Sequence, residues 1–292
     1  SSTGVIGVPL PMYCFEEHVP TLCRLLKQDK FDGVAKAIMT TDAFPKVSGR
    51  TIMIDGQEDR LLGLAKGAGL IQPDMATMLA FVMTDADIGA DILQHYLATG
   101  VERSFNRITV DGDTSTNDTV LALASYESGN PEIDTLDTEE SRIFGAALAD
   151  LLKDLALQIV TDGEGATKLV TVKVINAQSE SDAEQAARTI ANSALVKTAF
   201  FGEDANWGRI IAALGRSGVE FDQDSVDIAF DDVVLVRDGL GLGSEAEADA
   251  NEILQQKTFT VVVDLKTGQA ESEVYTCDLS VDYIKINADY RS

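Results

Sequence analysis

Histidine and cysteine are scarce in this sequence of 292 residues, which contains two histidines and three cysteines. A zinc site built from the usual ligands is therefore not expected, and the sequence predicts no metal and no bound organic cofactor. A Ser-His-Asp or Cys-His enzyme would have to use His18 or His95, and neither lies near a nucleophile motif. Cys14, Cys23 and Cys277 form no C-x-x-C pair and leave one cysteine over in any disulfide scheme. We expect buried free thiols and a cytoplasmic protein.

Basic residues are also few, because 23 Lys and Arg stand against 48 Asp and Glu, a formal net charge of −25. A chain this acidic is a poor partner for nucleic acid or for an anionic membrane surface, since both would bring like charges together. No apolar run approaches the roughly 20 residues of a membrane span. No basic and then apolar leader opens the chain. Nucleic acid and membrane are therefore not expected as partners.

Helical and strand-like patterns alternate irregularly, which favours a mixed α+β or a layered α/β domain. The longest helical pattern covers Thr138–Val160, with Asp137 and Glu140 in capping-box relation. Further helices are expected over Asp85–Leu97 with Asp85 as its cap, and after a second capping box formed by Ser181 and Glu184. Shorter helical patterns cover Phe15–Leu26, Trp207–Leu214 and Glu245–Gln256. A polar stretch at residues 178–182 predicts a boundary between a core and a smaller C-terminal α/β part.

A hairpin is expected near the end of the chain. The strand-like runs Thr258–Leu265 and Glu271–Leu279 flank Lys266-Thr267-Gly268, a short turn that contains glycine. The polar segment Asp111–Asp118 has oxygen-bearing side chains at alternate positions, as a calcium loop does. It has Thr116 where an EF-hand needs glycine, and Ala122 where it needs glutamate. We therefore expect a structural polar turn and not a metal site.

The most unusual stretch is Lys66–Leu79, in which Gly67 and Gly69 let backbone amides approach an anionic group. It does not match a P-loop, which needs Gly-Lys-Ser/Thr at the end of the glycine run. Thr77 stands at the start of an apolar run, where a threonine is ordinary in a strand. A threonine hydroxyl becomes a nucleophile when its own α-amine, with a pKa of about 8, takes the hydroxyl proton. That chemistry would require cleavage of the bond between Ala76 and Thr77.

Six blocks of the sequence resemble, in order, those of the ornithine acetyltransferase family of arginine biosynthesis, also called glutamate N-acetyltransferases. In this family an internal threonine cuts its own chain and becomes the N-terminal nucleophile. The blocks are Ser2–Gly7, Ala37–Asp42, Lys66–Leu79, Asp162–Lys168, Phe201–Arg209 and Lys285–Ser292. The resemblance implies a layered α/β sandwich similar to N-terminal-nucleophile folds.

The resemblance also implies a role for each matched residue. Thr77 would be the nucleophile, and the Thr3 hydroxyl and Gly4 N–H would stabilise the oxyanion, a task that typically contributes ~3 kcal/mol per donor. Cleavage would fall between Ala76 and Thr77. Substrate would be bound by Thr40 (or its neighbour Thr41), Lys66, Thr77, Glu164, Asn287 and Ser292. Taken singly, Lys66 could be a solvated loop lysine, and Glu164 could be a turn carboxylate.

The implied reaction transfers acetyl from N2-acetylornithine to L-glutamate by a ping-pong mechanism through an acetyl-threonine. Acetyl-CoA is a further donor in some members. The alternatives are an N-terminal-nucleophile amidase or aminopeptidase that hydrolyses the same intermediate, and a silent relative that acts only in assembly. Self-cleavage would give an alpha/beta heterodimer that pairs into a higher oligomer such as a heterotetramer.

The expected division of the chain follows from that cleavage. Residues 1–76 would be the C-terminal part of the pre-cleavage chain, with the family's N-terminal region absent. Residues 77–292 would be the post-cleavage chain, with its core at about 77–178 and its C-terminal α/β part at about 179–292.

Overall fold

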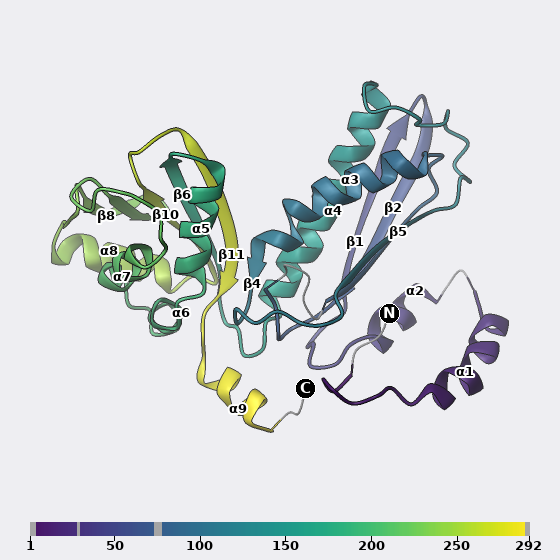
Figure 1. Cartoon of the computed structure of the whole chain (residues 1–292), viewed down its shortest axis with the longest axis horizontal. Helices are drawn as coiled ribbons and strands as arrows, with labels where there is room; N and C mark the ends of the chain where they lie inside the picture. Colours follow the sequence, from purple (N-terminus) through teal and green to yellow (C-terminus); the bar gives the residue numbers. More distant parts are fainter. Residues whose placement is uncertain (1–3, 28–29, 73–77, 290–292) are drawn as a thin grey trace.

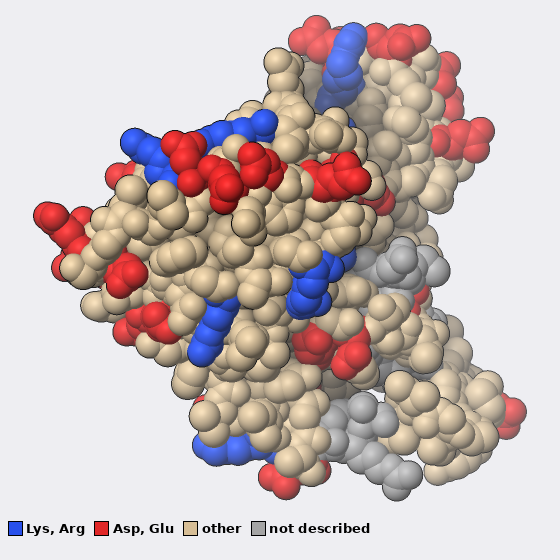
Figure 2. All heavy atoms as spheres, turned by 60° about the vertical axis from the view of Figure 1, so that its left-hand side comes forward, with Lys and Arg blue, Asp and Glu red and all other residues tan. Residues whose placement is uncertain are grey.

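The computed structural model describes residues 4–27, 30–72 and 78–289, which form two lobes, each built on its own sheet (Figure 1). Helices and strands alternate through both lobes, so the predicted α/β class is confirmed. None of the helices in these described ranges is long and apolar enough to cross a membrane. On the face drawn in Figure 2, Asp and Glu side chains gather in clusters over both lobes.

The first lobe is a four-stranded sheet with helices on one face (Figure 1). Its strands, in spatial order, are β1 (Lys46–Ile54), β2 (Gln57–Lys66), β3 (Leu79–Thr84) and β5 (Thr119–Ala124). β2 pairs antiparallel with β1 and β3, whereas β3 and β5 run parallel. Helices α3 (Ala90–Glu102) and α4 (Glu139–Thr161) pack on this sheet, α4 directly against β1 and β2.

Helix α4 is held on the sheet by an apolar stripe of fully buried leucines, including Leu148, Leu151 and Leu155. These residues recur every three or four positions, so they share one face of the helix. Each buried leucine contributes about 1.5–3 kcal/mol relative to an exposed one. Gly63 of β2 allows the close approach, because a Cβ there would lie 2.7 Å from the Leu151 side chain.

The second lobe contains a mixed seven-stranded sheet covered by α5 (Glu180–Ala191), α6 (Ala194–Phe201), α7 (Trp207–Gly215) and α8 (Ser244–Leu254). In spatial order its strands are β4 (Ile108–Thr109), β11 (Ala270–Cys277), β6 (Leu169–Ala177), β10 (Thr258–Asp264), β7 (Asp227–Phe230), β8 (Val233–Arg237) and β9 (Leu240–Gly241). The alternating valines of β6 are fully buried against α5. The expected boundary near residues 178–182 falls between β6 and α5, which pack together in this lobe.

The predicted hairpin near the end of the chain is wrong. β10 and β11 are not neighbours, because β6 lies between them, parallel to β10 and antiparallel to β11. The turn itself exists, but it docks on the end of β6, where Thr267 and Gly268 donate their backbone N–H groups to the carbonyl of Asn176. The glycine-containing turn in the sequence therefore gave no sign that β6 lies between the two strands that it connects.

The helix ends also differ from the predictions. The N-cap of α4 is Thr138, whose hydroxyl accepts the Ser141 N–H, in place of the Asp137–Glu140 box. Helix α3 begins after Gly89, because the Asp85 carboxylate accepts the backbone N–H of Arg60 instead of capping a helix.

The second predicted capping box is displaced as well. Ser179, and not Ser181, caps α5, and its hydroxyl accepts the N–H of Asp182.

The described chain also contains helices α1 (Met12–Arg24), α2 (Phe31–Ala37) and α9 (Val281–Asp289), and a short 3-10 helix at Phe105–Arg107. The expectation of buried thiols holds for Cys277, whereas Cys23 on α1 is exposed and Cys14 is half-buried. Helix α9 has no buried residue, and it follows β11 to the junction between the two lobes.

Candidate active site

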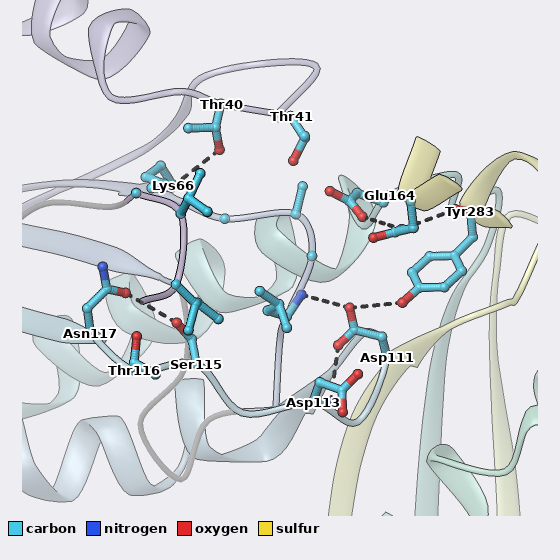
Figure 3. A pocket seen from close by; sticks show the side chains of 18 residues that line it. Thr40, Thr41, Lys66, Asp111, Asp113, Ser115, Thr116, Asn117, Glu164 and Tyr283 are labelled. Carbon is cyan, nitrogen blue, oxygen red and sulfur yellow. Dashed lines mark hydrogen bonds between the residues drawn. The ribbon is translucent and has the colours of Figure 1, made fainter. Parts of the chain in front are cut away.

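A cavity of about 380 Å³ opens where the two lobes and α9 meet. It is lined by the end of β2, the glycine-containing loop after it, the polar turn before β5, and residues of α9. Figure 3 shows Thr40 and Lys66 on one side of this cavity and Glu164 and Tyr283 on the other. Segments far apart in the sequence, from Gly4 to Asn287, thus share one site.

Lys66 is the last residue of β2 and is only 2% exposed. Its ammonium donates a hydrogen bond to the Thr40 hydroxyl at 3.3 Å. Burial lowers the pKa of Lys66, and the attraction of Asp42 opposes that effect. A partly desolvated cation in a cavity is suited to an anionic group of a ligand.

A buried ion cluster beneath Lys66 fixes the surrounding backbone. The Lys46 ammonium lies 2.6 Å from Asp42 Oδ1 and also bonds the Asp162 carboxylate. Asp42 in turn accepts the backbone N–H groups of Gly67 at 2.8 Å and Thr40 at 3.0 Å. Burial alone would raise the pKa of Asp42, but these hydrogen bonds hold it below its ordinary value. The cluster therefore joins the Thr40 loop to the end of β2.

Asp111 clamps the loop that follows Lys66. Its two carboxylate oxygens accept the N–H groups of Leu70 at 2.7 Å and Ile71 at 2.9 Å. The Tyr283 hydroxyl reaches the same carboxylate at 3.4 Å. Burial and the nearby acids Asp111 and Glu164 raise the pKa of Tyr283, which is therefore a neutral phenol at physiological pH.

Glu164 enters the cavity from the junction between α4 and β6. It is 7% exposed, and its Oε2 accepts the Asn287 amide of α9 at 2.7 Å. Gly69 makes room for it, because a Cβ at that position would lie 2.6 Å from the Glu164 carboxyl group. The Glu164 N–H donates to the Ala68 carbonyl at 2.8 Å, which fixes the carboxylate against the loop.

The structure brings together five of the residues predicted for the site. Gly4, Thr40, Lys66, Glu164 and Asn287 all line the cavity, as does Thr41, the neighbour that could not be told from Thr40 in the sequence.

The other predicted residues are Thr3, Ala76, Thr77 and Ser292, and they lie outside the described residues. The residue that follows the predicted nucleophile is Met78, which is described and lies beside Gly67 of the cavity lining.

Sequence reasoning missed Tyr283 and the clamp formed by Asp111. The Asp111–Asp118 segment, expected as a polar turn, contributes to the cavity lining through Asp111, Asp113, Ser115, Thr116 and Asn117. Within the described ranges, no group of three or more His, Cys, Asp or Glu side chains is arranged to hold a metal ion.

Comparison with known proteins gives one consistent family. The ArgJ family model matches residues 1–292. The arginine biosynthesis bifunctional protein ArgJ of Desulfotalea psychrophila is 56% identical over 292 residues, covering all of this chain and 74% of that protein. The protein of the same name from Rhizobium meliloti is 48% identical, covering all of this chain and 71% of its own length.

A solved structure is also similar. The crystal structure of arginine biosynthesis bifunctional protein argJ from Bacillus halodurans aligns with a TM-score of 0.69 and 43% identity. The alignment covers 72% of this chain and 98% of that chain. The solved chain is therefore shorter than this one, and nearly all of it shares this architecture.

Proposed function

The chain belongs to the ArgJ family, the ornithine acetyltransferases of arginine biosynthesis, and we propose that it transfers acetyl from N2-acetylornithine to L-glutamate. The transfer would proceed by a ping-pong mechanism through an acetyl ester on Thr77. Membership of the family supports the N-terminal-nucleophile α/β fold that the sequence predicted.

The observation that carries the proposal is the pairing of a buried cation and a buried carboxylate in one cavity. Lys66 is 2% exposed and Glu164 is 7% exposed, and both line the same space. The substrates are amino acids, so Lys66 would bind a carboxylate, while Glu164 and Asn287 would bind an amine. The Thr40 hydroxyl, already hydrogen-bonded to Lys66, would share in the carboxylate contact.

Self-cleavage between Ala76 and Thr77 would generate the nucleophile. Once free, the Thr77 α-amine would take the proton of its own hydroxyl as Oγ attacks the acetyl carbonyl. That proton would then pass to the departing ornithine nitrogen.

Glutamate would complete the cycle. Its amine attacks the acetyl-threonine, the ester bond breaks, and the Thr77 hydroxyl regains its proton. In both halves a tetrahedral oxyanion forms, which the Gly4 N–H and the Thr3 hydroxyl would stabilise. Ser292 would contribute to substrate binding from the end of the chain.

The remaining features of the proposal come from the family. Acetyl-CoA is a candidate second acetyl donor, in keeping with the word "bifunctional" in the relatives' names. Cleavage would leave residues 1–76 and 77–292 as the two chains of a heterodimer, with a heterotetramer as the expected assembly. The expected location is the cytoplasm.

Two measurements on one preparation test the proposal. Intact mass should show two pieces, residues 1–76 and residues 77–292, in place of a single 31.3 kDa chain, and Thr77→Ala should stay whole. Ornithine release from N2-acetylornithine should depend on added glutamate. Equal release with and without glutamate would instead identify an amidase that hydrolyses the acyl-threonine.

A further inference from the structure

The side chains of the two proposed substrates end in opposite charges. N2-acetylornithine has a side-chain ammonium group as its one cation, because its α-nitrogen is an uncharged amide. The side chain of glutamate ends in a carboxylate. Both molecules also have an α-carboxylate, which the proposed function assigns to Lys66. One cavity must therefore accept a cation and then an anion at the side-chain end in the two half-reactions.

Glu164 suits the cation and not the anion. Its carboxylate is 7% exposed and accepts the Asn287 amide, so it attracts the ornithine ammonium and repels the glutamate side chain. Further acids lie on this side of the cavity. Burial raises the pKa of Tyr283, and the negative charges of Asp111, Glu164 and Asp113 raise it further. A second ligand carboxylate is therefore disfavoured beside Glu164.

The polar turn before β5 supplies uncharged donors to the same cavity. Ser115, Thr116 and Asn117 are consecutive residues of this turn, and all three line the cavity. In Figure 3 they lie together, away from Glu164 and Tyr283. The Ser115 hydroxyl donates to Asn117 Oδ1 at 3.2 Å. The Thr116 hydroxyl is exposed and has no hydrogen-bond partner within the described part of the chain.

Lys66 makes this side of the cavity attractive to an anion. Its ammonium group donates to the Thr40 hydroxyl at 3.3 Å and has further N–H groups for a ligand. Burial raises the pKa of Asp118, the residue after Asn117, to about 7, while the Met78 N–H and the charge of Lys66 act in the opposite direction. Asp118 is therefore partly protonated at neutral pH and repels an anion less than an ordinary aspartate does.

We propose that the Thr116 hydroxyl donates a hydrogen bond to the side-chain carboxylate of glutamate, whereas the side-chain ammonium of N2-acetylornithine turns to Glu164. This inference rests on the proposed function. Both substrates are L-amino acids held by the α-carboxylate, so their side chains leave the α-carbon in one direction. They part at the next rotatable bonds, where staggered rotamers differ by about 120°. Thr116 thus selects the acceptor, and Glu164 selects the donor.

The test is steady-state kinetics of the whole, self-cleaved protein, because kcat/KM for each substrate of a ping-pong enzyme reports its own half-reaction. Thr116→Val keeps the shape of the side chain and removes the donor. It should lower kcat/KM for glutamate about tenfold and change kcat/KM for N2-acetylornithine by less than about twofold. Thr116→Ser keeps a hydroxyl and should retain most of the glutamate activity. Thr51→Val, at an exposed position of β1 outside the cavity lining, is the matched control and should change neither value.

Glutamine tests the recognition of charge directly, because a neutral amide replaces the side-chain carboxylate in a molecule of nearly the same size. The wild type should use glutamate at least about tenfold better than glutamine in kcat/KM. This ratio should shrink in Thr116→Val, which loses the donor to the carboxylate. A purely structural role of Thr116 would lower the use of both acceptors alike and leave the ratio as it is.

The outcomes separate this inference from the proposed function. Equal use of glutamine and glutamate by the wild type would overturn the inference even if Thr116→Val failed to fold. Equal losses in the two half-reactions of Thr116→Val would also overturn it, as would an unchanged ratio of glutamate to glutamine use. A wild-type chain that stays whole by intact mass would overturn the proposed function, and this inference with it.

Discussion

Replacing Lys46 with methionine removes the cation that two buried carboxylates share. The side chains of Lys46 and Asp42 are fully buried, and that of Asp162 is 5% exposed. Methionine is flexible and of similar size, so the substitution removes charge without leaving a large cavity. The consequence is an uncompensated pair of acids beneath the candidate site.

The expected loss is at the lower end of the range for a broken buried ion pair, which is about 3–5 kcal/mol. Each carboxylate keeps backbone donors, from Thr40 and Gly67 to Asp42 and from Ala43 to Asp162, so some compensation remains. We therefore expect the free energy of unfolding to fall by about 3 kcal/mol at pH 7.

The loss should depend on pH. In the wild type the pKa of Asp42 is lowered in the folded state. Its contribution to stability is therefore present above the unfolded pKa of about 3.9 and is lost as pH falls through the lower folded value. In Lys46→Met, burial is expected to raise the pKa of Asp42 above its unfolded value, because the cation that opposed burial is absent. Protonation then relieves the variant as pH falls, so its deficit should shrink between pH 7 and pH 5.

Urea unfolding at these two pH values measures the effect. Thr77→Ala should be present in every sample, so that cleavage does not alter the unfolding reaction. Lys285→Met is the matched control, since it breaks a surface pair with Asp282 in which the two side chains are 69% and 67% exposed. It should cost less than about 1 kcal/mol. Equal losses in the two variants, or a Lys46→Met deficit that is the same at pH 5, would refute the reasoning.

The charge distribution, a glycine and the thiols each give a further prediction. Residues 77–292 hold 15 basic and 39 acidic residues, and their negative field should repel anionic glutamate. Added salt should screen this field and lower the KM for glutamate, so a KM that does not change with salt would contradict the prediction. Gly69→Ala should displace Glu164 and raise the KM for N2-acetylornithine about tenfold, which corresponds to a loss of about 1.4 kcal/mol in binding free energy. Gly33→Ala is the control, because a Cβ at Gly33 would lie in open space, and its KM should not change. Initial-rate kinetics check both variants, and an unchanged KM in Gly69→Ala would argue against Glu164 as a ligand. A thiol reagent should modify exposed Cys23 in the native protein but reach Cys277 only on unfolding, because Cys277 is buried and burial raises its pKa; rapid labelling of all three thiols would contradict the fold.

The sequence predicted the elements of this fold better than their pairing. The helix expected over Thr138–Val160 is found at Glu139–Thr161, because a long apolar pattern of helical period is a strong local signal. The pairing of β10 with β6 could not be predicted in that way, since it joins Val261 to Val172 across almost ninety positions. The residues of the turn between β10 and β11 are the same whether or not another strand lies between those two strands.

In the candidate site, too, residues within recognisable sequence blocks were predicted, whereas contacts between distant residues were not. Lys66 and Glu164 were found through sequence blocks that resemble a family, and both prove to be buried in one cavity. Tyr283 was missed, because its hydroxyl meets Asp111 only after the chain has brought together residues 172 positions apart. No local periodicity encodes such a contact, and a tyrosine in a short C-terminal helix resembles any surface tyrosine until the fold is known.

The carboxylates around the site differ in how many of their oxygens accept a hydrogen bond. Asp42 is bonded by Lys46 and two backbone groups, and Asp111 by three backbone groups and the Tyr283 hydroxyl. Glu164 is bonded by the Asn287 amide. These carboxylates hold the loops in place, and their donors come from the chain itself. Asp118 differs, because one of its oxygens is buried without a donor from the described residues. Its other oxygen accepts the Met78 N–H at 2.7 Å, so Asp118 holds the residue before β3 through one oxygen alone, whereas buried acceptors are normally all satisfied.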